Sequence, residues 1–152
     1  MSTPLDQLKS VDLSHLSKEE AKEFTILLEE LEKREKRESS MASFYDFVKA
    51  IWPEFIAGAH HKKMAEAFDK IASGESKRLI INMPPRHTKS EFASYLFPAY
   101  LLGKRPKLKI IEATHTADLA INFGRRVRDL LESEEYAAVS YTHLTLPTIY
   151  SV

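Results

Sequence analysis

The sequence predicts an α/β fold in which helices flank a parallel sheet. Two short β-branched runs, residues 78–83 and 107–114, are typical of buried strands. Each run is followed by apolar residues at helical spacing, over 90–102 and 116–131. Strands that alternate with helices favour parallel pairing through right-handed crossovers. A chain of 152 residues is long enough for one such domain with a core.

Composition excludes several classes of protein. Lys plus Arg and Asp plus Glu both total 22, so net charge gives no global reason to bind nucleic acid, a membrane or an acidic substrate. The absence of cysteine excludes a disulfide framework, a thiolate metal site and a cysteine nucleophile. No window approaches the ~18 apolar residues of a membrane span, and the first residues lack the pattern of an export signal. We therefore expect an intracellular protein without a membrane span.

The N-terminal region, residues 1–40, is predicted to be a charged helical arm and linker. Ser17 and Glu20 have the capping-box spacing, and apolar residues recur at helical intervals from Phe24 to Leu31. The run EKREKRESS that follows has no apolar residue, so we expect it to fray into a linker. A helix that docks on a partner is an alternative, but a solvated arm is favoured.

An aromatic region from 43 to 72 predicts two helices. Pro53 should end the first near Trp52, because the residue before a proline is driven out of the helical conformation. The second helix should cover about 59–72, with Gly74 just beyond its end. Further along, Pro98 should kink or interrupt the helix predicted at 90–102.

The strongest chemical signal is the loop MPPRHTKSE, from Met83 to Glu91, between a predicted strand and a predicted helix. In the phosphate-binding pattern G-x-x-x-x-G-K-[ST], backbone N–H groups surround the phosphates, the lysine reaches the outer phosphate oxygens and the hydroxyl binds magnesium. Lys89 and Ser90 fit the last two roles. Both glycines are missing, however, since Met83 and Thr88 occupy their positions. The pattern alone leaves open a proline-stiffened turn with an exposed lysine.

The region from about Phe44 to Tyr136 resembles the N-terminal ATPase region of the large terminase subunit of tailed phages. Members of that family typically read R-L-I-I-N-M-P-P-R-H-G-K-S, and this chain reads RLIINMPPRHTKS. The resemblance implies a P-loop NTPase-type parallel sheet, incomplete here, in a partial ATPase domain over 41–138. It also implies ATP and Mg²⁺ as cofactors. The main departure is Thr88, where glycine is usual.

The same resemblance implies roles for individual residues. Arg86 and Lys89 would be catalytic, with Arg86 contacting the γ-phosphate. His87, Thr88 and Ser90 would join them in binding the phosphates, and Ser90 would be the Mg²⁺ ligand. Upstream, Trp52 and His60 occupy the place of the family's adenine-contacting segment.

Several of these residues also have ordinary structural interpretations. Core packing is the favoured role for Trp52. Of the neighbouring histidines His60 and His61, at least one is expected to be structural. A zinc site is not expected, since adjacent residues point to different faces and no further ligand cluster is visible. The arginines at 125, 126 and 128 lie off the apolar face of their helix, where solvated charge is the default and contact with DNA phosphates is the alternative.

Hydrolysis in such motors needs an acidic pair at the end of a later strand, and no such pair is evident here. Glu112 ends the second predicted strand, and a structural or surface role is expected for it. The nuclease part of the family is also missing. We therefore expect weak ATP binding at most and no turnover from this chain, although the intact protein would be an ATP hydrolase that packages DNA.

The resemblance further implies partners and a location. These are double-stranded viral DNA, the portal protein, the small terminase subunit and further copies of the chain, in the host cytoplasm and without a membrane. Two alternatives remain open from the residues alone. One is another P-loop motor such as a helicase, and the other is a non-enzymatic helical adaptor in which the MPPRHTKS turn is incidental.

The end of the chain breaks the charge pattern. Residues 137–152 contain no Lys, Arg, Asp or Glu. A terminal strand or edge hairpin is one interpretation. The segment SYTHLTLPT is similar to translated sequencing-adapter read-through, so residues 139–152 are expected to be a non-native tail and are set aside from the fold prediction.

Overall fold

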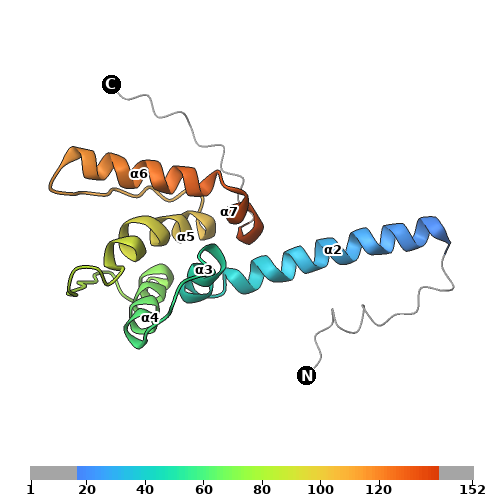
Figure 1. The fold of residues 1–152 in the computed structure, drawn as a ribbon, viewed down its shortest axis with the longest axis horizontal. Coiled ribbons are helices and arrows are strands. Elements are labelled where there is room, and N and C mark those ends of the chain that lie inside the picture. The colour runs from blue at the N-terminus through green and yellow to red at the C-terminus, as the bar shows by residue number, and fades with distance from the viewer. Residues whose placement is uncertain (1–16, 141–152) are drawn as a thin grey trace.

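Helices make up all the regular structure of the computed structural model, which describes residues 17–140 (Figure 1). The elements in chain order are α2 (Lys18–Ser40), α3 (Phe44–Ile51), α4 (Ala59–Ser73), the π-helical turn η2 (Glu91–Leu96), α5 (Phe97–Lys104), α6 (Ala117–Leu131) and α7 (Glu134–Val139). Over this part of the chain the protein is therefore an all-α structure.

The predicted α/β fold with its P-loop type parallel sheet is wrong for the residues that the structure describes. Both predicted strands, 78–83 and 107–114, lie outside the helices but form no strand. Ile80 keeps 86 % of its surface exposed and Ile111 keeps 94 %, so neither run is buried. A helix satisfies its backbone hydrogen bonds within itself, whereas a strand needs a neighbouring strand for them. In the structure the two runs do not pair with each other, so neither forms a strand.

The N-terminal arm begins as predicted. Ser17 is the N-cap of α2, where the Glu20 N–H donates to the Ser17 hydroxyl at 3.3 Å and the Ser17 N–H donates to the Glu20 carboxylate at 2.9 Å. The predicted fraying beyond Leu31 is wrong, because the helix continues to Ser40. Arg37 donates to the Ala137 carbonyl oxygen at 2.9 Å, and this contact with α7 anchors the charged end. Figure 1 shows the rest of α2 extending away from the other helices.

An aromatic core joins α3, α4 and α5. Phe44 is fully buried at its centre. Its ring lies 5.1 Å from that of Phe68 on α4, 5.5 Å from that of Phe92 in η2 and 5.4 Å from that of Tyr100 on α5, measured between centroids. The pairs with Phe68 and Phe92 are edge-to-face, a geometry that adds specificity to the burial of apolar area. The core therefore holds the helices on both sides of the loop 83–91 in fixed positions.

Helix ends in this region follow the sequence signals. Helix α3 ends with Trp52 as its C-cap, directly before Pro53, and Gly74 ends α4 in the left-handed conformation with φ of 85°. The predicted interruption at Pro98 is confirmed, since the turn before it is π-helical and the Phe97 N–H donates to the Phe92 carbonyl. A proline without an N–H leaves a carbonyl one turn earlier unpaired, and a wider turn accommodates that loss.

The last two helices close the structure. Thr116 caps α6 at the start of the helix predicted over 116–131, and Val127 and Leu130 face inward. Helix α7 buries Tyr136, whose hydroxyl donates to the Ala99 carbonyl oxygen of α5 at 2.9 Å. Val139 is also buried, so the described structure extends to the start of the predicted tail. The remainder of that prediction, 141–152, lies outside the described residues.

Candidate functional site

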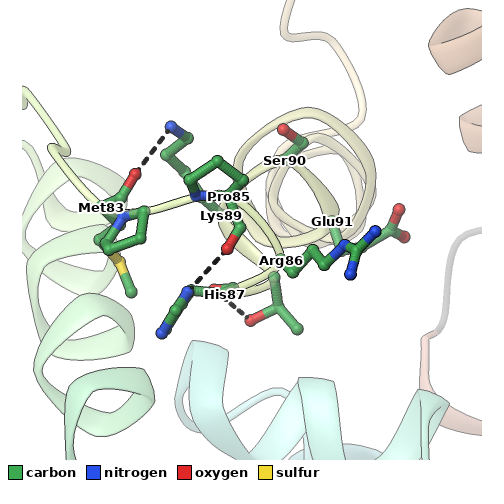
Figure 2. Close-up of a pocket in the computed structure, with 9 residues that line it drawn as sticks. Met83, Pro85, Arg86, His87, Lys89, Ser90 and Glu91 are labelled. Atoms are coloured by element: carbon green, nitrogen blue, oxygen red, sulfur yellow. Dashed lines mark hydrogen bonds between the residues drawn. The ribbon is translucent and has the colours of Figure 1, made fainter.

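Residues Met83 to Glu91 line an open pocket of about 560 Å³ between the first extended run and η2 (Figure 2). The predicted phosphate-binding residues Arg86, His87, Thr88, Lys89 and Ser90 all belong to its wall. The loop therefore forms a concave surface although the strand expected before it is absent.

Two residues of the loop adopt a backbone conformation that normally requires glycine. Arg86 has φ of 64° and Thr88 has φ of 55°, both in the left-handed region. This conformation costs a non-glycine residue about 1–3 kcal/mol, and a β-branched side chain such as that of Thr88 tolerates it poorly. Thr88 stands where the phosphate-binding pattern has its second glycine. Thr88 thus adopts the left-handed conformation for which glycine is suited, although it is not a glycine.

The backbone N–H groups of the loop are open to a ligand. Within residues 17–140, no N–H from Arg86 to Glu91 donates a hydrogen bond to a protein group, and the first that does is that of Phe92, to the Thr88 carbonyl oxygen at 2.9 Å. Unpaired N–H groups at the start of a helix carry partial positive charge. A loop with left-handed residues can turn successive N–H groups toward one anion. The chemistry of this wall suits an anionic ligand.

The two cations of the loop extend in different directions in Figure 2. The Lys89 ammonium donates to the Met83 carbonyl oxygen at 3.3 Å, across the pocket mouth. Arg86 is exposed and extends away from Lys89, and the Ser90 side chain is also exposed. A hydrogen bond of 3.3 Å to a neutral carbonyl is weaker than one to an anionic oxygen. Lys89 can therefore exchange its present partner for a phosphate oxygen.

The upstream aromatic and histidine cluster lies against this loop through His60 and His61. The His60 and His87 ring centroids are 5.8 Å apart. Trp52 stacks on Phe55 with 5.3 Å between ring centroids and keeps 38 % of its surface exposed, so it lies at the edge of the cluster and not in the core. The structure thus brings His60 to the loop and leaves Trp52 one ring further away.

His61 has the structural role expected for at least one of the two histidines, but its contact with the loop was not predicted. It is 7 % exposed, and its Nε2 lies 2.8 Å from the Thr88 hydroxyl oxygen, although the two residues are 27 positions apart. Burial lowers the pKa of His61, and the nearby rings of His60 and His87 lower it further. The ring is therefore held neutral at neutral pH. No spacing rule links positions 61 and 88, and only the packing of α4 beside the loop joins them.

The arginines of α6 divide into different environments. Arg126 makes a bidentate ion pair with Glu91, at 3.0 and 2.5 Å, and its guanidinium lies 4.3 Å from the Tyr95 ring centroid. Arg128 pairs with Asp129 at 2.9 Å. Arg126 thus fastens α6 to the first residue of η2. It connects the last long helix to the end of the loop.

Glu112, for which a structural or surface role is predicted, is half-buried in the second extended run. One of its carboxylate oxygens is buried and makes no hydrogen bond with the described residues. No group of three or more metal-ligating His, Asp or Glu side chains gathers within residues 17–140. Over the same range, no helix is long and apolar enough to cross a membrane.

None of the protein families, curated proteins or solved structures that were compared matches the chain. What the residues show is an open loop pocket with unpaired backbone N–H groups and one lysine, on an all-α support.

Proposed function

We propose that the loop 83–91 binds the phosphate groups of ATP together with Mg²⁺. The observation that carries the proposal is the set of unpaired N–H groups from Arg86 to Glu91, which line one pocket with Lys89. Backbone amides at a helix start and a nearby lysine are the groups that hold a polyphosphate. Lys89 leaves the Met83 carbonyl for a phosphate oxygen, Arg86 contacts the γ-phosphate and the Ser90 hydroxyl binds the Mg²⁺.

In this proposal the chain is the nucleotide-binding part of a DNA-packaging motor. The resemblance of RLIINMPPRHTKS to the phage terminase pattern supports this reading. The intact protein hydrolyses ATP to move double-stranded viral DNA, as an oligomer on the portal protein with the small terminase subunit, in the host cytoplasm. His60, beside the loop, and Trp52, at the outer edge of the aromatic cluster, contact the adenine. This chain by itself does not hydrolyse ATP, because no residue in it matches the acidic pair that hydrolysis needs in the family it resembles.

An NMR titration of the full chain with Mg-ATP tests the proposal. The contacts available, one lysine and a few amides, correspond to a Kd on the order of 1 mM. We expect saturable shifts of the amide signals from His87 to Ser90. Lys89→Ala removes a charge-assisted hydrogen bond and weakens binding about tenfold or more.

Lys36→Ala is the matched control, since Lys36 is an exposed lysine on α2. It should leave the Kd unchanged. Saturable binding that Lys89→Ala and Lys36→Ala reduce equally would show a general charge effect and refute the site. The absence of any saturable shift would refute phosphate binding.

A second candidate is a non-enzymatic helical adaptor. The all-α structure favours it, together with the exposed apolar side chains of α2, among them Ile26 and Leu27. An adaptor shows no Mg-dependent nucleotide binding, so the same titration separates the two candidates.

A further inference from the structure

A chain of hydrogen bonds joins the start of α4 to the loop. The Gly58 N–H donates to His61 Nδ1 at 2.9 Å, His61 Nε2 lies 2.8 Å from the Thr88 hydroxyl oxygen, and that hydroxyl donates to the His87 carbonyl oxygen at 2.7 Å. Because Nδ1 accepts a hydrogen bond, the neutral ring carries its hydrogen on Nε2. Nε2 is therefore the donor to the Thr88 hydroxyl oxygen. Each hydrogen bond of the series then has a defined donor and acceptor.

The His61 ring is held in place by its neighbours. Its centroid lies 4.7 Å from that of Phe55, 5.5 Å from that of Phe92 and 3.8 Å from that of His60. A donor whose rotamer is fixed by packing can position another group with little loss of side-chain freedom. The hydrogen bond to Thr88 is therefore made by a rigid part of the structure.

Thr88 needs such a partner because of its backbone. Its φ of 55° is easily adopted by glycine but not by a β-branched residue. The Thr88 hydroxyl makes two hydrogen bonds, since it accepts from His61 and donates to the His87 carbonyl oxygen. These bonds act on the residue whose backbone is strained. Glycine at this position would need no support and would offer His61 no atom to hold. The threonine and the histidine thus form a functional pair.

We infer that His61 is a positioning residue for phosphate binding, which holds Thr88 in the left-handed conformation and so keeps the loop N–H groups turned toward the ligand. The inference rests on the proposed phosphate-binding role of the loop. His61 contacts no phosphate and acts through the Thr88 hydroxyl. The pair replaces the second glycine of the phosphate-binding pattern by a side-chain hydrogen bond.

Two substitutions of His61 in the full chain separate its two hydrogen bonds. His61→Gln keeps a donor near the position of Nε2, whereas His61→Asn keeps a polar atom near Nδ1 for Gly58 but does not reach Thr88. We would measure the amide-to-Hα coupling of Thr88, which reports φ, and the affinity for inorganic tripolyphosphate by NMR titration. His61→Asn should change the coupling and weaken binding about three- to tenfold, the effect of one hydrogen bond. His61→Gln should restore most of both.

A double variant makes the test specific. In a Thr88→Gly background the loop needs no support, so adding His61→Asn should change the tripolyphosphate affinity less than twofold, on the order of the additivity error for independent sites. An equal loss of affinity with and without Thr88→Gly would overturn the inference, because His61 would then act by another route. Binding that His61→Asn leaves unchanged in the otherwise native chain would overturn it too. A native chain without saturable binding would instead overturn the proposed function.

Discussion

The conformation of Thr88 leads to a stability prediction with an unusual sign. Thr88→Gly and Thr88→Ala both remove the hydroxyl, so both lose the hydrogen bond to His61. They differ in the backbone, because at φ of 55° alanine pays about 1–2 kcal/mol that glycine does not. Alanine recovers about 0.4–1 kcal/mol through the lower entropy of its unfolded chain. We therefore expect Thr88→Gly to be the more stable of the two variants, by up to about 1.6 kcal/mol.

Urea unfolding of the full chain, followed by circular dichroism, measures this difference. Gly124→Ala is the matched control, since Gly124 lies within α6 and a Cβ there would meet no atom within 4 Å. At this position alanine should be the more stable residue by about 1 kcal/mol. The preference between glycine and alanine should thus have opposite signs at positions 88 and 124. A Thr88→Ala variant that is more stable than Thr88→Gly, as expected for alanine at position 124, would refute the left-handed conformation of Thr88 and the reasoning built on it.

Three further predictions concern the core and the pH dependence of stability. Asp69→Ala leaves a buried amide of α3 and the Tyr100 hydroxyl without their acceptor, so the free energy of unfolding should fall by about 3 kcal/mol, and by clearly less for Asp69→Asn. Gly103→Ala places a Cβ 2.7 Å from the buried Tyr136 hydroxyl and should cost about 2 kcal/mol, with a change below 0.5 kcal/mol, on the order of a surface substitution, counting against this packing. The lowered pKa of His61 means that below about pH 6.5 the unfolded chain binds a proton that the folded chain does not, so stability falls on acidification. Urea midpoints at about pH 7.5 and about pH 5.5 should differ less in His61→Gln, and an unchanged difference would contradict the role of this histidine.

The helices were predictable because their signals are local. The capping box at Ser17, the stop at Pro53 and the glycine after α4 each act within one turn of helix. The same local reasoning wrongly predicted fraying at the end of α2, where a distant part of the chain stabilises the helix. The charged end of α2 stays helical because Arg37 reaches the Ala137 carbonyl oxygen, 100 positions away. The composition of the charged run could not predict this hydrogen bond.

The strands were not predictable for a related reason. The β-branched runs 78–83 and 107–114 have strong intrinsic preference for extended structure. A preference for extended backbone does not supply the neighbouring strand that completes its hydrogen bonds. The two runs do not pair with each other in the described structure, and Ile80 and Ile111 remain exposed.

The loop from Met83 to Ser90 could be proposed as the candidate site from sequence, because it is continuous and carries its pattern locally. Thr88 could be recognised in the same way as the departure from that pattern. How the departure is accommodated depends on the packing, since α4 brings the His61 ring to the loop and the aromatic core fixes it there. A hydrogen bond between residues 27 positions apart depends on the packing of two elements, which neither segment encodes alone.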